Sequence, residues 1–214
     1  MRTLIINGSP KAQNGNTEVF IRQFAQGVKT PLEVRYAAKE EASVLAGSMK
    51  QYDTIIVAMP LYIHAMPGIV MKMLEQMEPA SDGERAMGFM VQSGFIESSQ
   101  SKYLERYLSA LARRFNYKYL GTMIKGGSAG ISMMPERMNQ KLFGQLRLFG
   151  EYFEKNGAFD PEIIKAFAKP GKLSKGQKML LGIVGWLGLE NHFFWNAMLK
   201  SNHALERRFD KPFQ

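Results

Sequence analysis

Short apolar segments alternate with amphipathic segments through most of the chain. The apolar segments predict strands over residues 2–6, 32–36, 52–58, 86–91 and 117–124. Apolar residues at helical spacing predict helices over residues 16–28, 68–76, 99–114 and 138–155. In the third helix, the apolar face is assigned to Tyr103, Leu104, Tyr107, Leu108 and Leu111. Asn156 and Gly157 predict the end of the fourth helix, because glycine favours the left-handed C-cap.

This alternation of strands and helices predicts an α/β fold with a parallel sheet covered by helices on both faces. The continuous apolar run Ile55 to Val57 agrees with such a sheet, whose strands are buried on both sides. Five strands in this pattern predict a doubly wound five-stranded parallel sheet of the flavodoxin-like order 2-1-3-4-5.

The pattern changes after residue 158. Residues 165–178 are rich in Lys, Gly and Pro, and residues 179–209 predict one or two helices. We therefore expect a domain at residues 1–158 and a C-terminal helical extension at residues 159–214, which packs on the domain or on a partner subunit. A less favoured role is contact with a membrane surface. Its anchors would be Trp186, Phe193, Phe194 and Trp195.

Composition excludes several classes of protein. The 214 residues are 45% hydrophobic and 22% charged, as in an ordinary globular protein. The absence of cysteine excludes disulfides, thiolate metal sites and a cysteine nucleophile. The longest apolar stretch, residues 179–189, is shorter than the roughly 20 residues that span a bilayer, and residues 3–6 are too short for a signal sequence. We therefore expect no transmembrane segment and a cytoplasmic location.

The chain carries 28 Lys and Arg against 19 Asp and Glu, a net charge of +9. Such a balance favours anionic partners, including phosphorylated cofactors, although a merely solvated basic surface explains it equally well. The basic residues are spread along the chain without a nucleic-acid-binding motif, so no nucleic-acid partner is expected. His64, His192 and His203 have no metal-ligand spacing, and no metal site is expected.

A polar loop, residues 7–17, joins the first strand to the first helix. A strand that feeds a helix N-terminus offers free backbone amides and the positive end of the helix dipole, which together bind phosphate. The candidate phosphate ligands are Ser9, Lys11, Asn14, Gly15, Asn16 and Thr17. The loop lacks the glycine patterns of nucleoside triphosphatases and of dinucleotide-binding proteins. Alternatively, the loop only caps the helix, through Asn16 or Thr17.

The loops after the third and fourth strands are the other candidate binding segments, because ligands in doubly wound folds lie at the carboxyl ends of the strands. Tyr62 is expected to pack against a ligand ring, or else to be an ordinary core residue. His64 is not assigned a catalytic role. The candidate residues of the two loops are Pro60, Leu61, Tyr62, Ile63, Gln92, Ser93, Gly94 and Phe95.

Two motifs carry a resemblance to a known family. The segment Asn7 to Lys11 followed by Gly15 to Thr17, and the segment Met59 to Gly68 followed by Lys72 and Leu74, resemble the motifs of flavodoxin-like NAD(P)H-dependent FMN reductases and related oxidoreductases. Together they organise about the first 130 residues. The resemblance implies a flavoprotein that binds FMN at these loops and uses NADH or NADPH as co-substrate. It further implies hydride transfer to a small acceptor such as a quinone, nitro or azo compound, and a homodimer.

Two other functions remain open at the level of sequence. A flavodoxin-type electron carrier would bind the same cofactor with the same fold but would not react with NAD(P)H. Carriers of that type are usually acidic, so the charge of +9 favours the reductase. A serine hydrolase would use Ser128, within the Gly-x-Ser-x-Gly pattern of residues 126–130, with Asp160 and His192 or His203. Pro135 lies where the helix after such a nucleophile should run, which disfavours this alternative.

Overall fold

The computed structural model describes residues 1–81, 83–188 and 195–211. The chain divides into two compact units, Met1–Lys172 and Leu173–Gln214.

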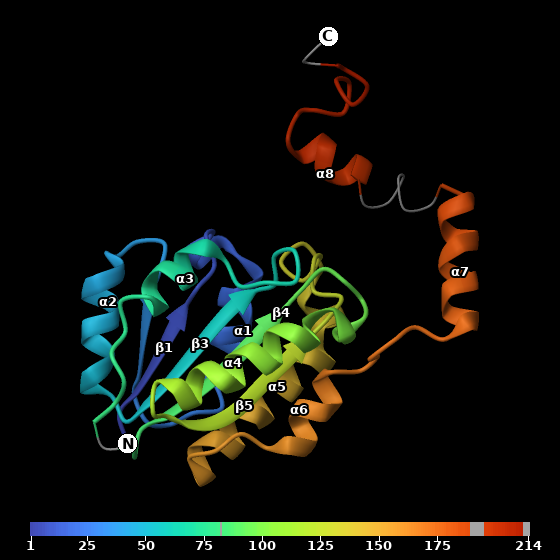
Figure 1. Cartoon of the computed structure of the whole chain (residues 1–214). Coiled ribbons are helices and arrows are strands. Elements are labelled where there is room, and N and C mark those ends of the chain that lie inside the picture. The colour runs from blue at the N-terminus through green and yellow to red at the C-terminus, as the bar shows by residue number, and fades with distance from the viewer. Residues whose placement is uncertain (82, 189–194, 212–214) are drawn as a thin grey trace. The chain divides into compact units, whose positions relative to one another are not determined.

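The first unit is built on a five-stranded parallel sheet. Its strands pair in the order β2-β1-β3-β4-β5, which confirms the predicted doubly wound, flavodoxin-like topology (Figure 1). The strands are β1 (Thr3–Asn7), β2 (Leu32–Tyr36), β3 (Thr54–Pro60), β4 (Ala86–Gln92) and β5 (Lys118–Lys125).

The helices of this unit are α1 (Asn16–Ala25), α2 (Ala42–Ser48), α3 (Gly68–Leu74), α4 (Lys102–Arg114), α5 (Glu136–Asn156) and α6 (Pro161–Phe167), with short 3-10 turns at Ala12–Asn14, Met49–Gln51 and Ser98–Ser101. Sequence periodicity did not predict α2 and α6, since 7 residues give only a weak helical period. Helix α3 is equally short, and it was predicted because Pro67 directly precedes it. The end of α5 is confirmed, since Gly157 caps it with φ at 61°.

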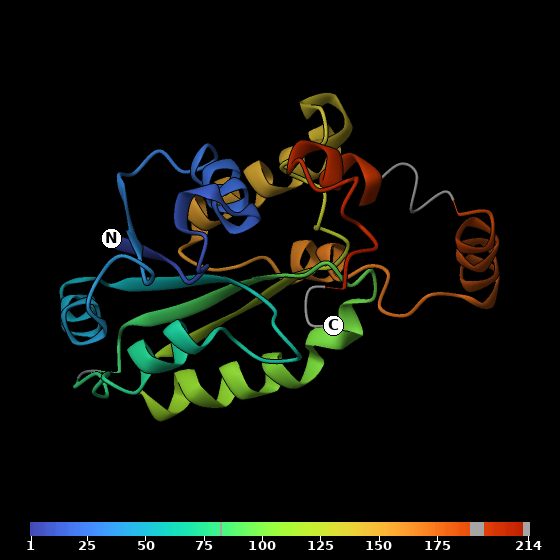
Figure 2. The same cartoon turned by 90° about the horizontal axis from the view of Figure 1, so that it is seen from above.

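Two apolar layers cover the two faces of the sheet. Alternate residues of each strand point to opposite faces, so Leu4 and Ile55 join one layer and Ile5 and Ile56 join the other. Helices α2, α3 and α4 cover the first layer, and α1 and α5 cover the second (Figure 2). Complete burial of such a side chain contributes about 1.5–3 kcal/mol, which explains why the continuous apolar strands lie between two helical layers.

The buried face of α4 differs from the prediction. Leu104, Leu108 and Ala112 are buried, at the i, i+4 and i+8 positions of one stripe. Tyr103 and Tyr107 are instead 71% and 54% exposed. The phenol hydroxyl makes tyrosine compatible with water, so these two side chains lie beside the buried face of the helix and are exposed to solvent.

The segment after residue 158 contributes to the core of the first unit. Phe159 and Phe167 are buried, and the Phe159 ring centroid lies 4.6 Å from that of Phe149 on α5. A side chain at Gly88 would place its Cβ 2.6 Å from the Phe159 ring, so β4 needs a glycine there. Because these aromatic side chains complete the core, the first unit ends at Lys172, later than the boundary predicted at residue 158.

In the described residues of the second unit, the helices are α7 (Lys175–Trp186) and α8 (Asn196–Ser201). A capping box begins α7: the Gln177 amide donates to Ser174 Oγ at 3.2 Å, and the Ser174 amide donates to Gln177 Oε1 at 2.9 Å. His192, Phe193 and Phe194, which were named as candidates from the sequence, lie outside the described residues. Within the described part of the chain, no helix is long and apolar enough to cross a membrane.

Candidate functional site

Four loops lie at the carboxyl edge of the parallel sheet, after β1, β3, β4 and β5. Hydrogen bonds join them into one framework. The Leu61 amide donates to the carbonyl of Gln92 at 2.8 Å, and the Gly127 amide donates to that of Phe95 at 2.8 Å. The Asn16 side chain donates to the Ser128 carbonyl at 2.7 Å. The sheet thus brings the loops that were predicted separately to one edge, where doubly wound folds bind ligands.

Asn7 holds the loop after β1 from inside. Its side chain is buried and donates to the Ala12 carbonyl at 3.2 Å and to Glu18 Oε2 at 3.0 Å. Its Oδ1 atom accepts a hydrogen bond from the Ser9 amide at 3.0 Å. Asn7 was not among the predicted site residues. The signal for it in the sequence is a polar residue directly after an apolar strand, where a buried amide needs partners in the following loop.

The N-terminus of α1 is left open by Gly15. This glycine is the N-cap residue, so no side chain caps the helix, and the amides of Asn16 and Thr17 have no partner among the residues that the structure describes. The alternative that Asn16 or Thr17 is the N-cap is therefore wrong. A Cβ at Gly15 would lie 2.8 Å from Ser9 Oγ, which places the serine hydroxyl against the open helix end. Free amides, a hydroxyl and the helix dipole together form an anion site.

The side chains of Asn16 and Thr17 have structural partners. Asn16 also donates to the Ala129 carbonyl at 3.2 Å, which ties α1 to the loop after β5. Thr17 Oγ1 accepts from Gln92 Nε2 at 3.3 Å, and both of these residues are buried. We call the loop after β1 together with the N-terminus of α1 the cradle. Because the side chains of Asn16 and Thr17 already have partners, these two residues offer the cradle their backbone amides. Lys11 and Asn14, by contrast, are exposed on the same loop.

The loop after β3 contains a strained turn. Pro60 and Leu61 are buried at its start. Tyr62 and Ala65 exchange two backbone hydrogen bonds of 2.9 and 3.0 Å around Ile63 and His64. Both central residues are left-handed, with φ at 48° and 63°. A β-branched residue such as isoleucine rarely adopts this conformation, which costs about 1–3 kcal/mol. The turn leaves Ile63 90% exposed at the sheet edge.

The loop after β4 adds a second apolar surface. Phe95 is half exposed and stacks on the His64 ring, with centroids 6.1 Å apart and planes 2° apart. The His64 Nδ1 atom lies 3.2 Å from the Gln100 carbonyl oxygen, so histidine joins the loops after β3 and β4. Ser93 is buried, and its backbone amide donates to the Lys125 carbonyl at 3.0 Å, while Gly94 is exposed. Beside the anion site, these loops therefore present exposed apolar groups.

Ser128 has the contacts of a structural residue rather than of a nucleophile. It is fully buried, its hydroxyl contacts Gln92 Oε1, and it donates to the Ser93 carbonyl at 2.8 Å. Asp160, the proposed triad acid, caps α6 by accepting from the Glu162 amide at 2.7 Å. The chain enters a helix again only at Glu136. These contacts argue against the hydrolase.

Lys125 is a charged residue at this edge that the sequence analysis missed. It ends β5 in register with Gln92 of β4. Partial burial lowers the pKa of its ammonium group below the ordinary lysine value, because desolvation disfavours the charged form. No cluster of His, Asp or Glu that would hold a metal ion occurs within the described ranges.

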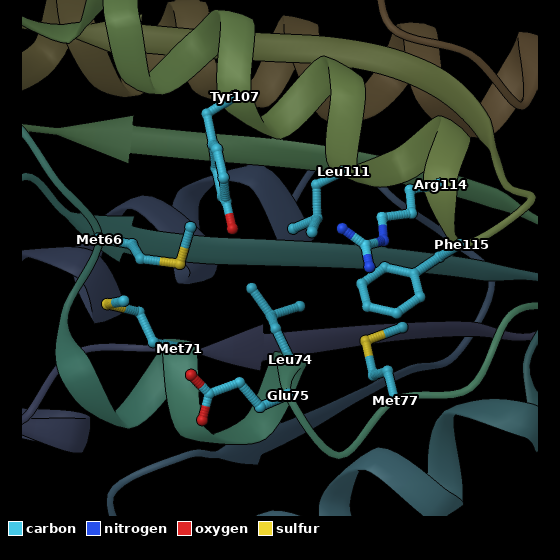
Figure 3. A pocket seen from close by; sticks show the side chains of 9 residues that line it. All are labelled: Met66, Met71, Leu74, Glu75, Met77, Tyr107, Leu111, Arg114 and Phe115. Atoms are coloured by element: carbon cyan, nitrogen blue, oxygen red, sulfur yellow. The ribbon is translucent and has the colours of Figure 1, made fainter.

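Apart from these loops, a hollow of about 310 Å³ lies between α3 and α4. Met66, Met71 and Leu74 face Tyr107 and Leu111 across it (Figure 3). Glu75, Met77, Arg114 and Phe115 complete its lining. None of the nine residues was predicted as a site residue. The hollow is separate from the cradle and from the loop after β4.

A doubly wound 2-1-3-4-5 sheet with binding loops at its carboxyl edge defines the flavodoxin-like class of folds. No protein-family model matches the chain, and no curated protein sequence matches it. Solved structures do match. An FMN-dependent NADH-azoreductase from Bacillus anthracis str. Ames Ancestor, in complex with FMN, shares 14% identity over 72% of this chain and 100% of its own, with a TM-score of 0.56.

Two further structures match with similar scores. An NADPH-quinone reductase from P. pentosaceus shares 17% identity over 70% of this chain and 98% of its own, with a TM-score of 0.54. The Trp repressor binding protein from Bacillus subtilis shares 15% identity over 68% of this chain and 96% of its own, with a TM-score of 0.53. At these identities the likeness shows a common fold, and the different names show that this fold serves several functions.

Proposed function

We propose that this protein is an FMN-dependent oxidoreductase that takes hydride from NADH or NADPH and passes it to a small acceptor such as a quinone, nitro or azo compound. The observation that carries the proposal is the open N-terminus of α1, where the free amides of Asn16 and Thr17 lie beside the Ser9 hydroxyl. The fold shared with an azoreductase that binds FMN and with a quinone reductase supports it.

The residues of the cradle fit the phosphate end of FMN. A flavin phosphate is a dianion that needs several hydrogen-bond donors and little steric bulk. The amides at the start of α1 and the Ser9 hydroxyl supply donors, and Gly15 leaves room for the phosphate oxygens. The exposed Lys11 and Asn14 would add a positive charge and an amide group from the same loop.

The neighbouring loops fit the isoalloxazine ring. Tyr62, Ile63 and Phe95 are exposed apolar side chains on the loops after β3 and β4. Their burial under a flat ring would stabilise the complex. The amides of Ile63 and His64, which have no partner among the residues that the structure describes, would donate to the polar edge of the ring. Gln92 donates to Thr17 of α1 at 3.3 Å. Gln92 and the two residues that follow it, Ser93 and Gly94, would meet the ribityl chain.

Bound FMN would supply the hydride chemistry, and the protein would bind, orient and shield it. None of the protein's side chains is assigned a proton-transfer role, since His64 is held between the Gln100 carbonyl and the Phe95 ring. The basic net charge would attract the phosphate groups of NADH or NADPH.

The first experiment is the absorption spectrum of the purified protein, followed by identification of any released cofactor. The protein should carry or take up FMN, and it should bleach in a fast, saturable reaction with NADH or NADPH in the absence of oxygen. A protein that binds FMN but stays yellow with both nucleotides would be an electron carrier. A colourless protein that takes up no FMN would contradict the proposal altogether.

We also propose that the protein forms a homodimer through the surface around the hollow between α3 and α4. Met71 and Tyr107, which line the hollow, are exposed, and so is Tyr103, one turn before Tyr107 on α4. Exposed apolar groups that gather on one surface favour association. Light scattering after size exclusion should give twice the mass of one chain. Tyr107→Glu should yield monomers, whereas Val44→Glu, on the exposed side of α2, should remain dimeric. A monomeric wild-type protein would contradict this proposal.

A further inference from the structure

Helix α7 exposes its large apolar side chains to solvent. No residue of this helix, all of which is described, is buried, although half of its residues have large apolar side chains. Trp186 is 85% exposed and Met179 is 70% exposed. The other exposed apolar residues are Leu180, Ile183 and, at the C-cap, Leu187. A run of exposed apolar groups this long indicates a surface that another apolar phase covers.

The lysines and two of the glycines of α7 form one narrow stripe. Lys175, Lys178, Gly182 and Gly185 follow the spacing i, i+3, i+7 and i+10, which places them along one side of the helix. Gln177, the other polar residue, lies outside the stripe in the first turn, where it takes part in the capping box with Ser174. The apolar residues occupy most of the remaining circumference. The helix is therefore amphipathic, with a wide apolar side and a lysine side whose glycines carry no bulk.

The charge on α7 has a single sign. Residues 173–188 contain two lysines, Lys175 and Lys178, and no Asp or Glu. Both lysines precede Met179, and the large apolar residues from Met179 onward follow them. Positive charge beside an exposed apolar helix complements a surface that is negatively charged outside and apolar beneath.

We propose that α7 binds the surface of an anionic lipid bilayer. The wide apolar side would lie among the acyl chains near the headgroups, with the lysine stripe toward the lipid phosphates and water. Trp186 fits this place, because the amphipathic indole ring favours the boundary between lipid and water. A helix of 12 residues is about 18 Å long, shorter than the roughly 30 Å hydrocarbon core, so it lies on the membrane and does not cross it.

Charge complementarity favours a bilayer over a protein partner as the occupant of this surface. A second copy of α7 would bring its own Lys175 and Lys178 toward those of the first copy, and these like charges repel one another. An anionic bilayer attracts those lysines and at the same time covers an apolar side that a groove in a folded protein would have to surround.

The two tryptophans of the chain make this proposal directly testable. Trp186 and Trp195 both lie in the second unit, so tryptophan emission reports on this unit alone. The full-length protein should be mixed with vesicles of phosphatidylcholine, with or without phosphatidylglycerol. We expect it to sediment with the anionic vesicles, with a blue shift of its emission, and to be released as salt is added. FMN content is not part of the readout, so failure here is distinct from failure of the proposed oxidoreductase.

Two variants separate the apolar and the electrostatic contributions. Ile183→Asp should weaken binding to anionic vesicles by about tenfold or more, because it places a charge in the apolar side. Lys175→Glu with Lys178→Glu should weaken the same binding by a similar factor. The matched controls are Val44→Asp and the pair Lys29→Glu with Lys141→Glu, which make the same changes at exposed positions of the first unit and should bind like wild type.

Three results would overturn the proposal. The first is a wild-type protein that stays in solution with its emission unchanged. The second is equal binding to neutral and anionic vesicles, which would remove the role of the lysines. The third is a blue-shifted emission without vesicles that Ile183→Asp abolishes together with self-association, since a second copy of the chain would then cover α7.

Discussion

At the scale of single residues, the loop after β1 is organised by groups that a motif does not reveal. The sequence correctly indicates a polar loop between strand and helix, but it suggests side chains as the ligands. In the structure, Asn16 and Thr17 bind other loops, and the buried Asn7 holds the backbone in place. Which donor remains free depends on partners such as Ser128, distant in sequence, so it cannot be inferred from the loop alone.

Gly15 should be the most sensitive position of the cradle. A methyl group there would lie 2.8 Å from Ser9 Oγ and would displace either the hydroxyl or the phosphate. Gly15→Ala should therefore weaken FMN binding by about tenfold, the loss of roughly one charged hydrogen bond. Gly144→Ala on α5 is the matched control, since open space surrounds that glycine. It should leave FMN affinity unchanged and stabilise the fold by about 0.5–1 kcal/mol. Equal affinities of the two variants in a fluorescence titration would argue against the phosphate site.

Lys125 should make stability depend on pH. Its pKa in the folded protein lies below the value of about 10.4 in the unfolded chain, so between these two values the unfolded chain binds more protons. Stability should therefore rise with pH across that interval. Lys125→Met should stabilise the protein near neutral pH, and its advantage over wild type should shrink as pH approaches the unfolded value.

Urea unfolding of both proteins at several pH values measures this effect. Lys29→Met, at an exposed position, is the control and should follow wild type throughout. A Lys125→Met variant less stable than wild type at neutral pH would show that the ammonium group has a stabilising partner.

At the scale of elements, the strands and their order were predictable, and the short helices α2 and α6 were not. Continuous apolar runs such as those of β3 and β4 carry a strong signal because both faces of each strand are buried. These two helices give only a weak helical period. The face of α4 was misassigned because the phenol rings of Tyr103 and Tyr107 count as apolar in a pattern but lie in water.

The aromatic cluster around α6 should decide where the first unit ends. Phe159 is buried among Phe24, Phe149 and Phe153, so Phe159→Ala should destabilise the protein by about 3–5 kcal/mol. Phe209→Ala, at an aromatic position that is 81% exposed, should change stability by less than about 0.5 kcal/mol. Urea unfolding followed by far-ultraviolet circular dichroism measures both. A loss below about 1 kcal/mol for Phe159→Ala would mean that the segment around Phe159, which leads into α6, does not belong to this core.

At the scale of the whole molecule, the fold and the net charge do not determine which reaction the protein catalyses, so experiment must test it. The same sheet serves proteins of different names, so the assignment depends on the loops and on the flavin they are proposed to bind. The second unit could be predicted only as helical. The spacing of its apolar residues indicates helices, but it does not indicate which surface these residues contact. Its exposed helix α7 is the part of the molecule best suited to bring the first unit to a lipid surface.

The central claim is that the N-terminus of α1 binds the phosphate of FMN, and comparing FMN with riboflavin tests it most directly. Riboflavin has the same ring and ribityl chain but no phosphate. Because each charged hydrogen bond contributes roughly 1.5–3 kcal/mol, flavin-free protein titrated with each ligand should bind FMN at least about 100-fold more tightly. Equal affinity for the two flavins, or no binding of FMN, would contradict the account.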